Sequence, residues 1–170
     1  AIPKFASALT EKYPDHTIYN LALGAEKGET KFNFVESNPA YSGIKQREYV
    51  KEESITEIVV PMDKLDNVVS DIHDVELIKI DVEGGEMDVL KGAAETILRC
   101  KPLVIFEFGL GASEFYGTTP KDMWELLVDR LGMKISLMKR YLKDQAAFTL
   151  DEFEVQYTDR LNYYFIAYFS

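Results

Sequence analysis

The chain has 170 residues, and its content of 46% hydrophobic and 28% charged residues is typical of a globular domain that buries a core of its own. A formal net charge of −10 argues against an electrostatic grip on nucleic acid or on an anionic membrane surface. No apolar run approaches the roughly 20 residues of a membrane span, and no Cys/His spacing typical of a metal site is present.

Cysteine usage and the first residues bear on the cellular location. Cys100 is the one cysteine, which excludes an internal disulfide and suits a reducing compartment. No signal peptide is visible, because Ala1-Ile2-Pro3-Lys4 opens directly into ordinary sequence. We therefore expect a cytoplasmic protein. Because the chain does not begin with methionine, we also expect that it was processed or taken from a longer one.

The first part of the chain predicts one helix and three strands. Apolar residues at helical spacing indicate a helix over 3–13. Strands are predicted at 17–23, 31–35 and 56–62, and the last two are expected to pair with each other. Periodicity is lost over 36–54, and a loop of this length inside a domain is either functional or mobile.

The second part alternates apolar strands with helices. A strand is predicted at 77–82, a helix at 86–99 and a further strand at 103–108. Four more elements are predicted towards the end: a helix at 120–131, a strand at 134–138, packed but irregular chain at 144–159, and a strand at 162–169. This order predicts an α/β fold with a parallel sheet in the middle and an antiparallel last pair of strands.

Acidic residues follow both central strands. Asp81 and Glu83 come at the end of the strand at 77–82, and Glu107 ends the strand at 103–108. Glu83 projects to the same side as Asp81 if the strand continues. In open α/β sheets, ligands bind in the crevice beyond the carboxyl ends of the strands. The alternative is that Asp81 and Glu83 cap the helix that follows and accept its free N–H groups.

Several stretches together carry the similarity to a known family. They are Leu77-Ile78-Lys79-Ile80-Asp81-Val82-Glu83-Gly84-Gly85-Glu86, Val89-Leu90-Lys91-Gly92-Ala93, Lys101-Pro102 before Ile105-Phe106-Glu107 and, more weakly, Asn20-Leu21-Ala22-Leu23-Gly24 and Val60-Pro61-Met62-Asp63-Lys64-Leu65-Asp66. This pattern resembles the FkbM-type S-adenosylmethionine-dependent methyltransferases. The resemblance implies an enzyme with a Rossmann-like class I methyltransferase fold, formed by residues 1–170 as a single domain. It also implies a mostly parallel sheet with an antiparallel C-terminal strand pair.

The N-terminal part departs from the pattern of this class. Class I methyltransferases begin with a strand, a glycine-rich turn over the methionine part of the cofactor, and a strand that ends in an acid for the ribose. No glycine-rich turn precedes Gly24, and nothing before Thr17 is strand-like. By this resemblance we expect an N-terminally truncated fold that lacks half of its cofactor pocket. Either an upstream piece exists, or the chain is an inactive fragment completed by a partner.

The resemblance also implies the chemistry of the site. The cofactor is S-adenosylmethionine, and the methyl acceptor is a hydroxyl of a sugar, a polyketide or another small metabolite. Asp81 is placed to orient or deprotonate that hydroxyl, and its charge suits the sulfonium. Glu83 and Glu107 are the other catalytic candidates. Ala22 and Leu23 are expected to bind the cofactor on its adenine side, together with Asp81.

The candidate substrate-binding residues lie in the long loop. They are Asn38, Tyr41, Ser42 and Arg47. Tyrosines and an arginine suit a sugar or another hydroxylated substrate, although an exposed mobile loop also accounts for them.

Two other functions remain open at this point. A metal-dependent hydrolase would use Asp81, Glu83 and Glu107 as oxygen ligands for Mg²⁺ or Mn²⁺. A non-catalytic remnant or interaction module would need none of them. The sequence leaves open whether the chain forms a homo-oligomer.

Overall fold

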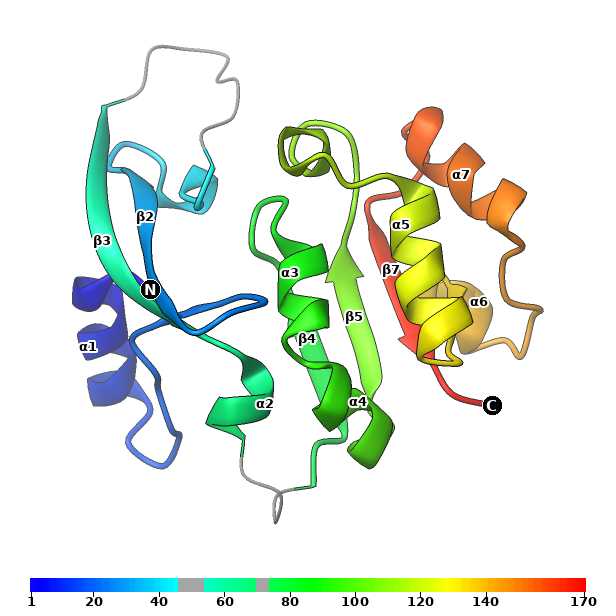
Figure 1. Cartoon of the computed structure of the whole chain (residues 1–170), viewed down its shortest axis with the longest axis horizontal. Helices are drawn as coiled ribbons and strands as arrows, with labels where there is room; N and C mark the ends of the chain where they lie inside the picture. The colour runs from blue at the N-terminus through cyan, green and yellow to red at the C-terminus, as the bar shows by residue number, and fades with distance from the viewer. Residues whose placement is uncertain (46–53, 70–73) are drawn as a thin grey trace.

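The strands form two separate sheets in the computed structural model, which describes residues 1–45, 54–69 and 74–170 (Figure 1). The first sheet has three strands in the order β1-β3-β2, and the second has four in the order β4-β5-β7-β6. Helices lie beside both sheets, so the protein is a mixed α/β fold, as predicted. Within the described residues, no helix combines the length and apolar character needed to cross a membrane.

The N-terminal half contains the three-stranded sheet. Its elements are α1 (Pro3–Lys12), β1 (Ala22–Leu23), β2 (Gly28–Val35), the 3-10 helix η1 (Pro39–Tyr41), β3 (Ile55–Asp63) and α2 (Leu65–Val68). The expected pairing of β2 with β3 is confirmed, and it is antiparallel, from Gly28 opposite Met62 to Val35 opposite Ile55. The prediction of a strand at 17–23 is wrong for residues 17–21. Only Ala22 and Leu23 find partners, at the very end of β3.

The C-terminal half begins with the central motif. Its first elements are β4 (Leu77–Ile80), α3 (Glu86–Lys91), α4 (Ala94–Cys100), β5 (Leu103–Glu107) and the 3-10 helix η2 (Ser113–Tyr116). The strand β4 stops at Ile80 rather than at Val82, because the chain then turns through Glu83 in the left-handed region. The sequence predicts one helix at 86–99 after this turn, whereas the structure has the two helices α3 and α4 there.

The last elements contain one more correction. They are α5 (Pro120–Trp124), its π-helical continuation η3 (Glu125–Arg130), β6 (Lys134–Ser136), α6 (Met138–Tyr141), α7 (Leu150–Thr158) and β7 (Tyr164–Tyr168). The irregular chain predicted at 144–159 is wrong, because most of it is α7. Thr149 and Glu152 form a capping box at the start of α7, and Phe153 and Tyr157 bury one face of the helix.

The sheets are less parallel than expected. Of the strand pairs among the described residues, β1/β3 and β4/β5 are parallel, whereas β2/β3, β5/β7 and β6/β7 are antiparallel. The antiparallel C-terminal pair is confirmed. Parallel pairing is limited because β7 lies between β5 and β6 and runs against both. The parallel β4/β5 pair brings the two acidic strand ends to one edge of the sheet.

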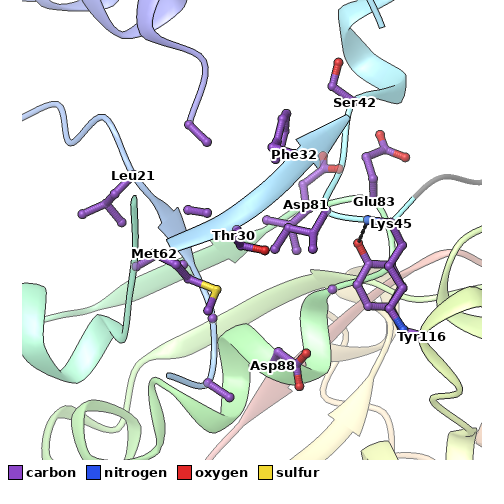
Figure 2. Close-up of a pocket in the computed structure, with 18 of the residues that line it drawn as sticks. Leu21, Thr30, Phe32, Ser42, Lys45, Met62, Asp81, Glu83, Asp88 and Tyr116 are labelled. Carbon is purple, nitrogen blue, oxygen red and sulfur yellow. Dashed lines mark hydrogen bonds between the residues drawn. The ribbon is translucent and has the colours of Figure 1, made fainter. Parts of the chain in front are cut away.

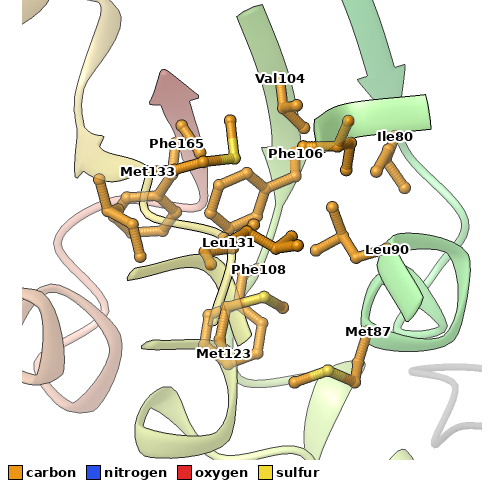
Figure 3. Packing of buried hydrophobic residues seen from close by; sticks show 14 of the residues in the cluster. Ile80, Met87, Leu90, Val104, Phe106, Phe108, Met123, Leu131, Met133 and Phe165 are labelled. Carbon is orange, nitrogen blue, oxygen red and sulfur yellow. The ribbon is translucent and has the colours of Figure 1, made fainter. Parts of the chain in front are cut away.

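A hydrophobic core holds β4 and β5 in place (Figure 3). Ile80, Phe106 and Phe165 alternate inward from three neighbouring strands and are at most 2% exposed. Helix residues such as Leu90 and Met123 pack on the same cluster. Full burial of one such side chain stabilises a fold by roughly 1.5–3 kcal/mol. Asp81 and Glu107 directly follow Ile80 and Phe106, so this core fixes the backbone from which they extend.

A close backbone contact joins the two halves near Gly92. A Cβ atom on Gly92 would lie 2.0 Å from the carbonyl oxygen of Gly24, so only glycine fits there. The Asp66 amide donates to the Gly92 carbonyl at 3.0 Å. The Asp66 carboxylate accepts from the amides of Glu95, at 3.2 Å, and Thr96, at 2.8 Å, in the first turn of α4. The end of β1 is thereby held against the junction of α3 and α4.

Candidate active site

A cavity of about 1240 Å³ lies between the two sheets (Figure 2). One wall is formed by the end of β1, by β2 and by the loop at 39–45. The other wall is formed by the turn after β4, the end of β5, and the side chains of Tyr116 and Tyr164. The cavity therefore lies at the carboxyl ends of β1, β4 and β5, where the sequence predicts a ligand site.

Asp81 and Glu107 meet in this cavity. The register of β4 with β5 pairs Ile80 with Phe106, so the next residue of each strand leaves the sheet at the same edge. Burial, together with the hydrogen bond to Asp81 and the negative charge of Asp81, raises the pKa of Glu107 to about 7. The two side chains therefore form an acid pair, with Glu107 as the member that ionises near neutral pH.

Lys79 and Tyr164 contact this pair. Lys79 Nζ donates to Asp81 Oδ2 at 2.6 Å, and this hydrogen bond lowers the pKa of Asp81. Tyr164 Oη donates to Glu107 Oε2 at 3.4 Å. The negative charges of Glu107 and Asp81 raise the pKa of Tyr164. Neither Lys79 nor Tyr164 was expected as a site residue, although Lys79 stands two residues before Asp81 and therefore on the same side of the strand.

The turn after β4 depends on Gly84 and Glu86. A Cβ on Gly84, whose φ is 106°, would lie 2.6 Å from the carbonyl oxygen of Ala112. The buried Glu86 accepts from the amides of Val82, at 3.1 Å, and Gly84, at 3.2 Å. Burial raises the pKa of Glu86. Glu86 thus binds the amides of the turn before α3, whereas the alternative interpretation had Asp81 and Glu83 accept the free N–H groups of the helix itself.

Glu83 lies at the cavity because of the turn after β4, and not because the strand continues as expected. The strand does not continue to Glu83, which has a φ of 58°. Glu83 nevertheless lines the cavity together with Asp81, because the turn carries it over the end of β4. Ala22 and Leu23 line the opposite wall, next to Met62. The predicted catalytic and cofactor-binding residues therefore share one cavity, and their roles remain predictions.

The loop with the predicted substrate-binding residues is tied to β2. Asn33 and Gly43 exchange backbone hydrogen bonds of 2.8 and 3.2 Å, and the Val35 amide donates to Ser42 Oγ at 3.0 Å. Tyr41 and Ser42 line the cavity, whereas Asn38 lies outside its lining at the start of η1. Arg47 lies outside the described residues.

Tyr116 connects this loop to the turn after β4. The Lys45 amide donates to Tyr116 Oη at 3.0 Å, and Lys45 Nζ lies 4.9 Å from the centroid of the tyrosine ring (Figure 2). The ring packs against Gly84 and Gly85. Burial raises the pKa of Tyr116. No local sequence pattern marks Tyr116, because its place depends on contacts between segments far apart in the chain.

The comparisons with known proteins agree with this geometry. The sequence profile of the Methyltransferase FkbM domain matches residues 2–135, so the chain belongs to that family, as its motifs predict. The crystal structure of Methyltransferase FkbM from Methylobacillus flagellatus KT is similar in fold, with a TM-score of 0.51 at 17% sequence identity. The match covers 97% of this chain and 33% of that chain, so this chain spans about a third of the other's length. No curated protein gave a significant match.

Proposed function

We propose that the protein is an S-adenosylmethionine-dependent methyltransferase that methylates a hydroxyl of a small acceptor, such as a sugar or a polyketide. Membership of the FkbM methyltransferase domain family supports the reaction class. The observation that carries the proposal is the meeting of Asp81 and Glu107, from neighbouring parallel strands, in a cavity that Ala22 and Leu23 also line. As part of the proposal, residues 1–170 act as one domain of a cytoplasmic protein.

The lining of the cavity fits a cationic methyl donor. Asp81, Glu83 and Glu107 bring negative charge to one wall, and Ala22 and Leu23 offer apolar surface for an adenine ring on the other. A volume of about 1240 Å³ exceeds the roughly 300–1,000 Å³ of typical small-molecule pockets, which leaves room for donor and acceptor together. When bound, S-adenosylmethionine supplies an electrophilic methyl group on a positively charged sulfur.

The acid pair supplies the proton chemistry in this proposal. A hydroxyl that gains a methyl group must lose its proton. Asp81, kept ionised by Lys79, accepts a hydrogen bond from the acceptor hydroxyl and orients it. The proton passes from the hydroxyl to Asp81 and then along the hydrogen bond that joins Asp81 to Glu107, and the unprotonated Glu107, with a pKa of about 7, takes it up. A base whose pKa lies near the working pH is the efficient choice for this step.

The acceptor would approach from the loop tied to β2. Tyr41 and Ser42 line that side of the cavity and are proposed to contact the acceptor, with Asn38 and Arg47 as further candidates. The hydroxyl of Ser42 accepts the Val35 amide with one lone pair, so its O–H and its second lone pair are available to contact the acceptor. The apolar C–H face of a sugar ring would pack on the ring of Tyr41.

The hydrolase alternative has no specific observation in its favour. Across residues 1–45, 54–69 and 74–170, no group of three or more His, Cys, Asp or Glu side chains is arranged to hold a metal ion. One carboxylate oxygen of Asp81 instead binds the Lys79 ammonium. The remaining alternative, a non-catalytic module, becomes an outcome of the test.

The test combines cofactor binding with turnover. Calorimetric titration with S-adenosylhomocysteine is expected to give binding to the protein, and labelled S-adenosylmethionine is expected to label one of a panel of hydroxylated acceptors. Asp81→Asn should lower turnover about a hundredfold with little change in the Kd of S-adenosylhomocysteine. The control is Asp129→Asn, the same change at an exposed residue of η3.

Two results would overturn this proposal. Unchanged turnover in Asp81→Asn would remove Asp81 from catalysis. A protein that binds no S-adenosylhomocysteine and labels no acceptor would instead be a non-catalytic module or a fragment that a partner completes.

A further inference from the structure

We propose that Lys79 is a positioning residue for this reaction: its ammonium group holds Asp81 ionised, so that the proton shared by the acid pair resides on Glu107. The inference rests on the proposed function, because it assigns the two carboxyl groups their separate roles. It concerns a residue that makes no contact with the reacting atoms and acts through Asp81.

Three neighbouring strands bring the participating groups to one side of the sheet. Lys79 lies on β4, Asp81 directly follows the last residue of β4, Glu107 ends β5, and Tyr164 stands opposite Glu107 on β7. The alternate residues of these strands point to the other side, into the hydrophobic core. Lys79, Glu107 and Tyr164 therefore lie on strands and Asp81 directly follows one, so the sheet fixes the backbone of all four.

Asp81 and Glu107 can have separate roles only if their pKa values differ clearly. Both extend from the same edge of the same sheet, and two adjacent like charges cannot both form without a large cost. Burial of Glu107 already favours the proton on Glu107, and without a further influence on Asp81 part of the proton would still reside on Asp81. If the proton resides sometimes on Asp81 and sometimes on Glu107, neither residue is consistently the base or the group that orients the hydroxyl.

Lys79 supplies this influence. Among the described residues, the groups that act on the pair are Lys79 on β4, Glu83 in the turn, Glu86 at the start of α3 and Tyr164 on β7. Of these four, Lys79 alone is positively charged. It lies 2.6 Å from Asp81 Oδ2, and its hydrogen bond is the largest influence that lowers the pKa of Asp81. The negative charges of Glu83 and Glu86 raise the pKa of Glu107, which adds to the effect of Lys79 and favours the proton on Glu107.

The sign of the pH dependence follows from this arrangement. In the wild-type protein, turnover should rise with pH as Glu107 loses its proton, with a midpoint of about 7. Removal of the Lys79 charge raises the pKa of Asp81 and lets the pair keep its last proton to higher pH. The rising limb of the rate profile should therefore move to higher pH.

The experiment compares three variants. Lys79→Met removes the charge, keeps a flexible side chain, and should move the midpoint upward by about one pH unit, since the lysine is partly exposed. Lys79→Arg should restore the wild-type midpoint. Lys134→Met is the matched control, because Lys134 is an exposed lysine on β6 of the same sheet. The KM for the acceptor should stay close to the wild-type value in all three.

A second readout needs no activity. Carboxyl ¹³C NMR of the wild-type protein and of Lys79→Met should show the titration midpoint of Asp81 moving upward in the variant. An unchanged Asp81 midpoint would overturn the inference, whatever the activity. A shifted Asp81 midpoint with an unmoved rate profile would also overturn it, yet would leave the proposed function standing. The failure of the proposed function itself is read separately, from a wild-type protein that binds no S-adenosylhomocysteine.

Discussion

The two halves of the molecule differ in how they are held together. The buried members of the core cluster all lie in the C-terminal half, whereas Leu23 and Leu65 of the N-terminal half are only partly buried against it. In the N-terminal half, the described hydrophobic residues that are buried are Ala22, Val35 and Val60, and α1 buries no residue. The acid pair stands on the well-packed half, and the proposed acceptor loop stands on the lightly packed one.

This difference matches what each half is proposed to do. Groups that orient a hydroxyl and take up its proton must keep their relative positions to within a fraction of an ångström, which a dense core favours. A wall that admits and releases a small molecule gains from weaker packing, since segments with few buried contacts open most easily. The cavity thus lies between a densely packed wall that carries the acid pair and a less densely packed wall that is proposed to bind the acceptor.

The largest expected effect comes from the core under the acid pair. Phe106 is fully buried and packs against Phe165 with 5.8 Å between the ring centroids. Phe106→Ala should lower the free energy of unfolding by about 3–5 kcal/mol, measured by urea denaturation. The control is Val59→Ala on β3, where 64% exposure predicts a change within about 0.5 kcal/mol. Equal losses of unfolding free energy in the two variants would contradict the difference in packing between the two halves.

A smaller effect is expected where the halves touch. Gly92→Ala would set a Cβ against the Gly24 carbonyl and should lower the free energy of unfolding by about 1–3 kcal/mol. Hydrogen exchange should speed up at the amides of α2 and remain slow in β5. Gly28→Ala is the control, since a Cβ there meets nothing within 4 Å. Unchanged exchange in α2 would mean that this contact does not join the halves.

The sequence predicted the elements that carry strong apolar runs. The strands β4 and β5 and the pairing of β2 with β3 follow from such runs. The helix α7 was missed, because only Phe153 and Tyr157 mark its buried face among many charged residues. Its start signal, the capping box of Thr149 and Glu152, was present in the sequence. The predicted strand at 17–23 failed because a strand needs a partner, which no local pattern supplies.

The candidate site was predictable where it depends on strand ends. Asp81 and Glu107 meet because parallel neighbours end at one edge, a rule that needs no coordinates. Lys79 could have been found from its spacing to Asp81. Tyr116 could not, because its contacts with Lys45 and with the turn after β4 join segments that lie far apart in the sequence.

The most direct test of the account is the titration of Glu107 itself. Carboxyl ¹³C NMR should give a midpoint of about 7 for Glu107 in the wild-type protein. In Asp81→Asn the midpoint should fall, because the neighbouring charge is gone, and burial should still keep it above the value of a free glutamate. Asp129→Asn should leave it unchanged. A Glu107 that titrates like a free glutamate, or that ignores the loss of Asp81, would contradict the acid pair and the mechanism built on it.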